Sequence, residues 1–239
     1  MLYKTKGIVF QTIKYTDNSF IAKIYTALFG LQSFLVNNPR GKKSSTKINV
    51  FQPMNLVELV MYRKEKKQLQ RIKEIKIDQA FISIPFDNSK TGIVFFLNEI
   101  LCKCIKEEES RPDFFMFLHN SLNELDKTEK KITNFHLRFL IQLSEHLGFM
   151  PGTNFSDAVQ VFDLREGVFV RDPNENCLSK QASETLFFIA KASPEEIAGT
   201  VIPAVIRREI IYGMLHYFKI HVHGFGEVKS HIVLEDINS

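Results

Sequence analysis

The sequence predicts an α+β protein, in which a β-rich N-terminal part precedes a helical part that carries an inserted β-hairpin. Up to about residue 80, apolar residues alternate with polar ones in short runs, and from about residue 85 they recur at three- and four-residue spacing. The charge changes at the same place. Residues 1–80 carry 15 Lys and Arg against 5 Asp and Glu, a net charge of +10, whereas residues 81–239 have a net charge of −6. We therefore expect two domains, residues 1–80 and residues 81–239.

Four strands are expected in the first part, at residues 3–14, 20–26, 31–36 and 55–62. They are rich in β-branched and aromatic residues, and turn signals such as Thr16-Asp17-Asn18-Ser19 and Gly30 separate them. Residues 69–77 are ambiguous, because their apolar residues begin at helical spacing and alternate as in a strand from Ile75 on. As a strand, this segment completes the five of an OB-fold barrel; as a helix, it leaves a four-stranded sheet.

Helical signals follow residue 85. We expect a helix with an apolar stripe over residues 89–109, a second that begins at Pro112, and a third over residues 133–147 that ends at Gly148. A capping box at Ser193-Pro194-Glu195-Glu196 predicts the start of another helix, and Pro203 begins the last one. Residues 158–164 and 168–170 flank Arg165-Glu166-Gly167, which predicts a β-hairpin inserted around residues 155–178.

Composition excludes several classes of protein. With 239 residues, 44% of them hydrophobic, the chain is long enough to bury a core. No run approaches the ~18 apolar residues of a membrane helix, and the N-terminus lacks an apolar signal stretch, so we expect a cytoplasmic protein. Three cysteines argue against a disulfide framework. Phosphate-binding loop, GxSxG and zinc-protease motifs are missing from the sequence, so we expect no catalytic residues and no cofactor.

The strongest local signal is a pair of basic loops. Residues 40–47 place four cations and three hydroxyl groups in one loop, and residues 63–67 place four more cations in another. Cations and hydroxyls in this mixture are typical of proteins that hold a nucleic-acid backbone through its phosphates. The residues that we expect to contact DNA are Lys14, Lys23, Arg40, Lys42, Lys43, Lys47, Arg63, Lys64, Lys66 and Lys67.

On the five-strand interpretation, residues 14–19 and 63–67 are the two loops that flank the oligonucleotide-binding face of the barrel. Tyr15 and Tyr25 lie near these loops in sequence and are candidates for base stacking, although ordinary packing is the simpler interpretation of each ring. An alternative function is a protein-interaction scaffold whose basic face binds an acidic protein tail. Salt-dependent DNA binding separates the two hypotheses.

Short motifs also occur in a characteristic order along nearly the whole chain. They are Gly7-Ile8-Val9-Phe10, Tyr15, Ser19, Thr26, Gly30, the basic loop after Pro39, Arg138, Leu147-Gly148, His223-Gly224, Lys229-Ser230 and Val233-Leu234. In this order they resemble the RecO family of bacterial DNA-repair proteins. The resemblance implies an N-terminal OB-fold, a helical C-terminal domain and a non-enzymatic recombination mediator in DNA repair.

The resemblance also implies partners. These are single- and double-stranded DNA, the acidic C-terminal tail of the single-strand-binding protein SSB, and RecR. Members of the family anneal complementary strands and help to load the recombinase RecA on SSB-coated gaps at the nucleoid. Many members carry a four-cysteine zinc motif, but here residues 153–179 retain only Cys177. We therefore expect no zinc, and a hairpin stabilised by apolar packing of Phe155, Val159, Val161, Phe162, Val168 and Phe169.

Overall fold

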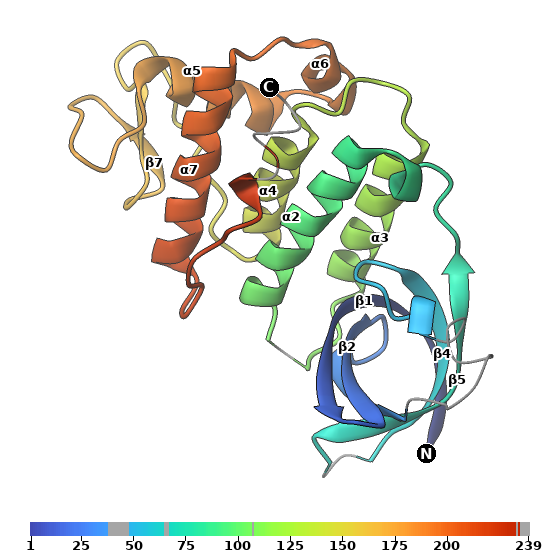
Figure 1. Cartoon of the computed structure of the whole chain (residues 1–239). Coiled ribbons are helices and arrows are strands. Elements are labelled where there is room, and N and C mark those ends of the chain that lie inside the picture. Colours follow the sequence, from blue (N-terminus) through green and yellow to red (C-terminus); the bar gives the residue numbers. More distant parts are fainter. Residues whose placement is uncertain (38–47, 65–66, 107, 233, 235–239) are drawn as a thin grey trace. The chain divides into compact units, whose positions relative to one another are not determined.

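The computed structural model describes residues 1–37, 48–64, 67–106, 108–232 and 234. Five strands form a closed barrel in the order β1-β2-β3-β5-β4 (Figure 1). They are β1 (Leu2–Thr16), β2 (Ser19–Thr26), β3 (Gly30–Asn37), β4 (Leu56–Tyr62) and β5 (Leu69–Gln79). The α+β fold class with an N-terminal OB-type barrel is confirmed, and the ambiguous residues 69–77 belong to a strand.

Strand β1 pairs with two other strands of the barrel. Residues 2–8 pair with β4, and residues 7–16 pair with β2. Between Val9 and Gln11 the register of the β1–β2 ladder shifts, and the Val9 backbone instead exchanges hydrogen bonds with Met54 and Asn55. Such a bulge bends a strand and increases its twist, which lets one strand turn a corner between two partners.

The barrel closes through a short contact. Strands β3 and β5 pair in parallel, and the pairs are Ser33 with Leu69 and Phe34 with Gln70. Buried apolar side chains fill the interior, and they are Val9, Ala22, Ile24, Phe34, Phe51, Val57, Leu59 and Met61. Partly buried residues of β3 and β5, among them Val36, Ile72 and Ile75, pack against this core.

The β2–β3 turn explains why glycine stands at position 30. Gly30 has a φ of +61°, and a Cβ there would lie within 2.8 Å of the Glu109 backbone. The Thr26 hydroxyl donates to the Gly30 carbonyl at 3.0 Å and accepts the Phe29 N–H at 3.1 Å. Only glycine adopts this backbone conformation at such a close approach without strain.

Helices pack on part of the outer face of the barrel. One compact unit consists of residues 1–87 and 97–127, so it includes α3 (Pro112–Lys127) and the second half of α2 (Asn88–Cys104). Phe114 and Phe115 of α3 lie against Tyr25 of β2, with ring centroids 5.4 and 6.5 Å from its ring. The connection after β5, with the short helix η1 (Ile84–Phe86), is fixed by Asp126, whose carboxylate accepts the N–H groups of residues 82–84.

The second unit consists of residues 88–96 and the chain from residue 128 on. Its helices are α4 (Phe135–His146), α5 (Lys180–Lys191), α6 (Pro194–Gly199) and α7 (Ala204–His221), and its hairpin is β6 (Val161–Asp163) with β7 (Val168–Val170). The capping box at Ser193 and the hairpin are confirmed. Helix α5 was not among the helices expected from the sequence, although Ser179 caps it by accepting the Ala182 N–H. The division of the chain at residue 80 stays a prediction.

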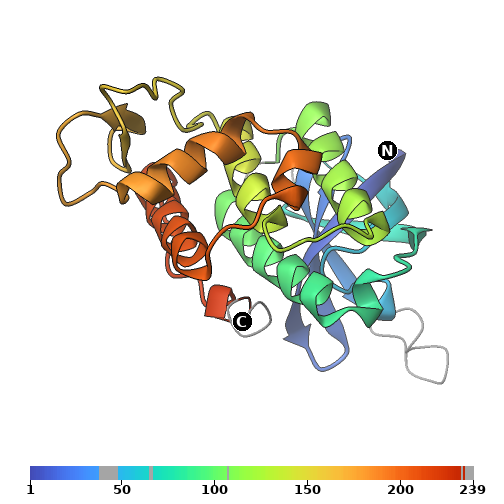
Figure 2. The ribbon, with the colours of Figure 1, turned by 90° about the horizontal axis from the view of Figure 1, so that it is seen from above.

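The hairpin packs into an aromatic cluster of Phe149, Phe155, Phe162, Phe169, Phe187 and Tyr217. Its backbone lies beside α5 and α7 (Figure 2). Phe162 lies 5.2 Å from Phe169 and 5.7 Å from Tyr217, between ring centroids, and is completely buried. The expectation for Val168 is wrong, because this side chain is 37% exposed. It follows that the aromatic rings, rather than both faces of the ribbon, fill the space behind the hairpin.

Polar side chains complete the hairpin. Asp163 Oδ1 accepts the N–H groups of Arg165 and Glu166 at 2.8 and 3.0 Å, and its Oδ2 accepts a hydrogen bond from Asn174 Nδ2 at 2.6 Å. Asn154 bonds both backbone groups of Phe169, at 2.8 and 2.9 Å. Side-chain hydrogen bonds therefore order the turn and the segment that precedes it. Across the described parts of both units, no helix is long and apolar enough to cross a membrane.

Candidate nucleic-acid interface

The β1–β2 loop, residues 14–19, is a tight hairpin turn at the end of the longest strand. Thr16 pairs with Ser19, their hydroxyl oxygens lie 2.6 Å apart, and the Asn18 N–H donates to Thr16 Oγ1 at 3.3 Å. Lys14 is exposed and forms an ion pair with Asp17 at 3.0 Å. Since both partners are in water, this pair is worth little and leaves Lys14 available to a phosphate.

The β4–β5 loop, residues 63–67, is held from inside the barrel. The buried side chain of Gln70 accepts the Lys64 N–H at 2.9 Å and donates to the carbonyls of Lys64 and Lys67 at 3.0 and 2.6 Å. The Arg63 guanidinium lies 4.5 Å from the centre of the Phe29 ring. One buried amide thus fixes the backbone on both sides of this loop, while Lys64 and Lys67 remain exposed, with no ion pair to any described residue.

Strand β3 pairs with residues beside both loops. At one end Asn37 pairs with Ser19, beside the β1–β2 loop, and near its middle Ser33 pairs with Leu69, beside the β4–β5 loop. Four residues of strand separate these pairs, which is roughly 13 Å at about 3.3 Å per residue. The β4–β5 loop precedes Leu69 and therefore lies toward the β2–β3 turn, where Arg63 lies on Phe29, so the two loops are found toward opposite ends of β3.

The remaining expected contacts are placed differently. Lys23 is half-buried on the outer side of β2, where its charge acts on Cys102 of α2, so the structure does not bring it to the two loops. Arg40, Lys42, Lys43, Lys47 and Lys66 lie outside the described residues. Tyr25 is 2% exposed beneath α3 and is a packing residue, whereas Tyr15 is 58% exposed.

Strand β5 adds cations that were not among the DNA contacts expected from the sequence. Arg71, Lys73 and Lys76 are exposed along it, and they alternate with the apolar residues that face the core. Lys76 and Lys4 each lie 2.9 Å from Glu58, and their hydrogen bonds, that of Lys76 first, lower the pKa of this carboxyl group below its ordinary value. The signal was the charged–apolar alternation of residues 71–77, which becomes informative once the segment is known to be a strand.

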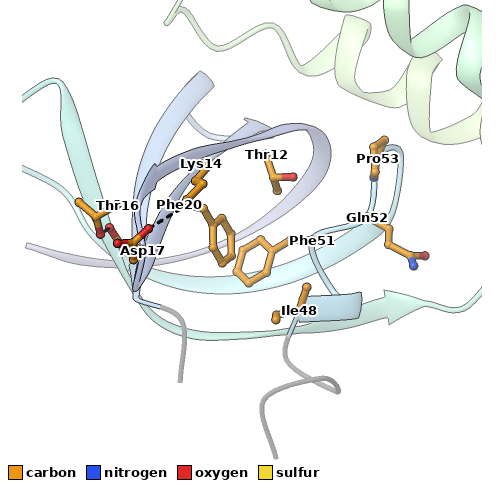
Figure 3. A pocket seen from close by; sticks show the side chains of 10 residues that line it. Thr12, Lys14, Thr16, Asp17, Phe20, Ile48, Phe51, Gln52 and Pro53 are labelled. Carbon is orange, nitrogen blue, oxygen red and sulfur yellow. Dashed lines mark hydrogen bonds and ion pairs between the residues drawn. The ribbon is translucent and has the colours of Figure 1, made fainter. Parts of the chain in front are cut away.

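Two hollows open in the barrel, one beside the β1–β2 loop and one along β5. The hairpin hollow, of 390 Å³, lies against the β1–β2 loop and is lined by Thr12, Lys14, Thr16, Phe20, Phe51 and Pro53, among others (Figure 3). The slot, of 660 Å³, lies between β3 and β5, where apolar side chains such as Val36, Ile72 and Ile75 meet the cations of β5. Phe20 and Phe51 lie side by side in Figure 3 and line both hollows.

Thiol and imidazole chemistry is weakly represented. Burial raises the pKa of Cys102 to about 11 and that of Cys104 to about 12, so both thiols stay protonated near neutral pH. Burial, with a smaller contribution from the charge of Arg207, lowers the pKa of His136 to about 3 and keeps its ring neutral. Cys177 accepts the Asn174 N–H at 3.4 Å. Among the described residues, no three His, Cys, Asp or Glu side chains gather as a metal site would require.

Comparison with known proteins matches both parts of the chain. Residues 1–81 match the family model described as the N terminal of recombination protein O, and residues 85–230 match that of its C terminal. Similar full-length proteins, each called DNA repair protein RecO, occur in Flavobacterium psychrophilum (35% identical, 100% of both chains) and Phocaeicola vulgatus (33%, 100% of both chains). A third, from Bacteroides fragilis, is 34% identical over 99% of both chains. The chain therefore belongs to the RecO family of DNA repair and recombination proteins.

Proposed function

We propose that this protein is a non-enzymatic recombination mediator, which binds DNA through the β1–β2 and β4–β5 loops of its barrel. The observation that carries the proposal is the exposed positive charge of these loops, Lys14 in the first and Lys64 and Lys67 in the second, on strands of one closed barrel.

Family membership supports the biological role. We propose that the protein binds single- and double-stranded DNA, anneals complementary strands and helps to load recombinase on gaps covered by SSB. The partners proposed with it are RecR and the acidic tail of SSB, and the proposed location is the cytoplasm, at the nucleoid. Arg40, Lys42, Lys43 and Lys47 of the first basic loop, and Lys66 of the second, remain proposed DNA contacts on their sequence alone.

Annealing of complementary oligonucleotides coated with SSB tests this function. We expect the protein to accelerate duplex formation severalfold over SSB alone, without nucleotide and without added metal. The matched control uses SSB that lacks its acidic tail. Equal duplex formation with and without the protein would contradict the mediator function, whereas acceleration that is independent of the tail would remove only the proposed SSB contact.

A further inference from the structure

Resting on the proposed function, we propose that the slot between β3 and β5 binds unstacked bases of single-stranded DNA, while the cations at its rim hold the phosphates. The slot exists because β3 and β5 pair at residues 33–34 and 69–70, and β5 then continues along the barrel without pairing to β3 among the described residues. Its 660 Å³ lies within the roughly 300–1,000 Å³ of ligand pockets, which are mostly apolar with a few polar groups.

The walls of the slot are chemically suited to a flat, weakly polar ring. Leu35 and Val36 of β3 lie on one side, and Ile72, Ile75 and Ile77 of β5 on the other. These side chains are only partly buried. Apolar surface that remains open to water gains free energy when a ligand covers it, and the faces of DNA bases are such ligands once they are unstacked.

Phe20 and Phe51 supply the aromatic surface. Their ring centroids lie 5.2 Å apart at an interplanar angle of 78°, and Phe20 is half-buried whereas Phe51 is buried. Both rings also line the hairpin hollow, next to the hydroxyls of Thr12 and Thr16. Stacking on an aromatic side chain tolerates any base, so this arrangement requires no particular base sequence.

The charges at the rim favour a polyanion over an apolar peptide. Arg71, Lys73 and Lys76 line the slot against one acidic side chain, Glu74. Arg71 has no ion pair with a described residue, and the pair of Lys73 with Glu74 is long, at 3.7 Å. The slot adjoins the hairpin hollow, whose lining includes Lys14, because Phe20, Ile48 and Phe51 line both. A DNA duplex cannot cover the apolar side chains of the slot with its bases, because these are already stacked and paired.

Abasic DNA separates contacts to bases from contacts to phosphates. The full chain is titrated by fluorescence anisotropy against a twelve-residue oligothymidylate and against a strand of equal length and charge that lacks its bases. We expect the abasic strand to bind at least about tenfold more weakly, which is the order expected for losing one or more base–aromatic stacks. Equal affinity for the two strands would overturn the proposal. Failure to bind either strand would instead contradict the proposed function.

Two matched substitutions locate the effect. Phe20→Leu keeps an apolar side chain in the barrel but removes the ring, and we expect it to lose most of the difference between the two strands while binding the abasic strand as the unmodified protein does. Phe86→Leu makes the same change at a ring that is 86% exposed in the same compact unit and outside both hollows, and it should keep the full difference. A melting temperature recorded for each variant identifies loss of fold. An undiminished difference in folded Phe20→Leu protein would overturn the assignment to the slot, as would a Phe86→Leu effect of equal size.

Discussion

The barrel and the β6–β7 hairpin both place aromatic side chains next to polar ones, but they use them differently. In the hairpin, Phe162 and Phe169 are buried together with Tyr217, and the Asp163 carboxylate is occupied by local hydrogen bonds. In the barrel, Phe20 and Phe51 border two hollows, and Lys64 and Lys67 are exposed with no ion pair to a described residue. The hairpin therefore contributes stability, whereas the barrel leaves apolar surface and positive charge available to a ligand.

The largest expected effect is a loss of stability in the β6–β7 hairpin. Phe162→Ala should lower the free energy of unfolding by about 3–5 kcal/mol, because it removes a completely buried ring from the aromatic cluster. Chemical denaturation of the purified variant measures this loss. Val168→Ala, on the facing strand but 37% exposed, is the control and should stay within about 0.5 kcal/mol of the unmodified protein. Similar losses for both variants would show that the ribbon is buried on both faces.

A smaller effect is expected at Asp163. Burial raises the pKa of this carboxyl group, but hydrogen bonds from Asn174 and from the backbone of Glu166 and Arg165 outweigh it, and the pKa falls below its ordinary value of 3.8. The charged form therefore stabilises the fold above about pH 4, and this stability is lost as the pH falls through the lowered pKa. At pH 7, Asp163→Asn should cost about 1.5–3 kcal/mol, the range for hydrogen bonds to a charged group.

Stability curves of both proteins across the acid range check the sign. The difference between Asp163→Asn and the unmodified protein should shrink as the pH falls below 4. A difference that stays constant from pH 7 to pH 3 would mean that the carboxylate charge contributes nothing and that the substitution acts through shape alone.

These two residues also show how far sequence reasoning reaches. The turn signal at Arg165-Glu166-Gly167 between two apolar runs was sufficient to predict the hairpin, because its two strands are neighbours in sequence, whereas the burial of Phe162 also depends on Tyr217 of α7. The sequence did not reveal that Asp163 bonds Asn174, eleven residues on, or that Asp126 fixes residues 82–84 from more than forty residues away. Such contacts depend on which elements the fold brings together, and periodicity carries no information about that.

The candidate site also combines features that the sequence predicts with features that depend on the tertiary structure. Lys14 and the β4–β5 loop were predicted because turn residues and clustered cations identify loops directly. The buried amide of Gln70, which fixes that loop, and the slot itself depend on the parallel pairing of β3 and β5. Lys23 was predicted from its strand alone, and the same alternation that places Ala22 and Ile24 in the core directs Lys23 to the outer side, next to α2.

The cations of the barrel give a prediction of intermediate size. Lys64→Ala with Lys67→Ala should reduce the slope of log K against log salt by about 1.4 on single strands, because each lost phosphate contact removes about 0.7. Lys4→Ala with Lys6→Ala removes the same charge at residues paired with Glu58 and Asp78 and should change the slope less. Equal changes for the two double variants would mean that net charge, and not the position of the loop, sets the affinity.

The smallest expected effect concerns metal. Elemental analysis should find far less than one zinc per chain, and a chelator should leave the melting curve unmoved, because the hairpin is held by the aromatic cluster and by side-chain hydrogen bonds. Stoichiometric zinc, lost together with the fold, would contradict this account of the hairpin and direct attention to Cys177 and the histidines of the last helix and its continuation, His216, His221 and His223.

The salt dependence of DNA binding tests the central claim most directly. That claim is that residues 1–80, with a net charge of +10, bind DNA phosphates by electrostatic attraction. Titration of the full chain with a single-stranded oligonucleotide, from low to moderate salt, should give a slope of log K against log salt of about −3 to −4, as expected for about five phosphate contacts. A slope near zero would contradict the claim, because binding would then depend on groups other than the cations of the two loops.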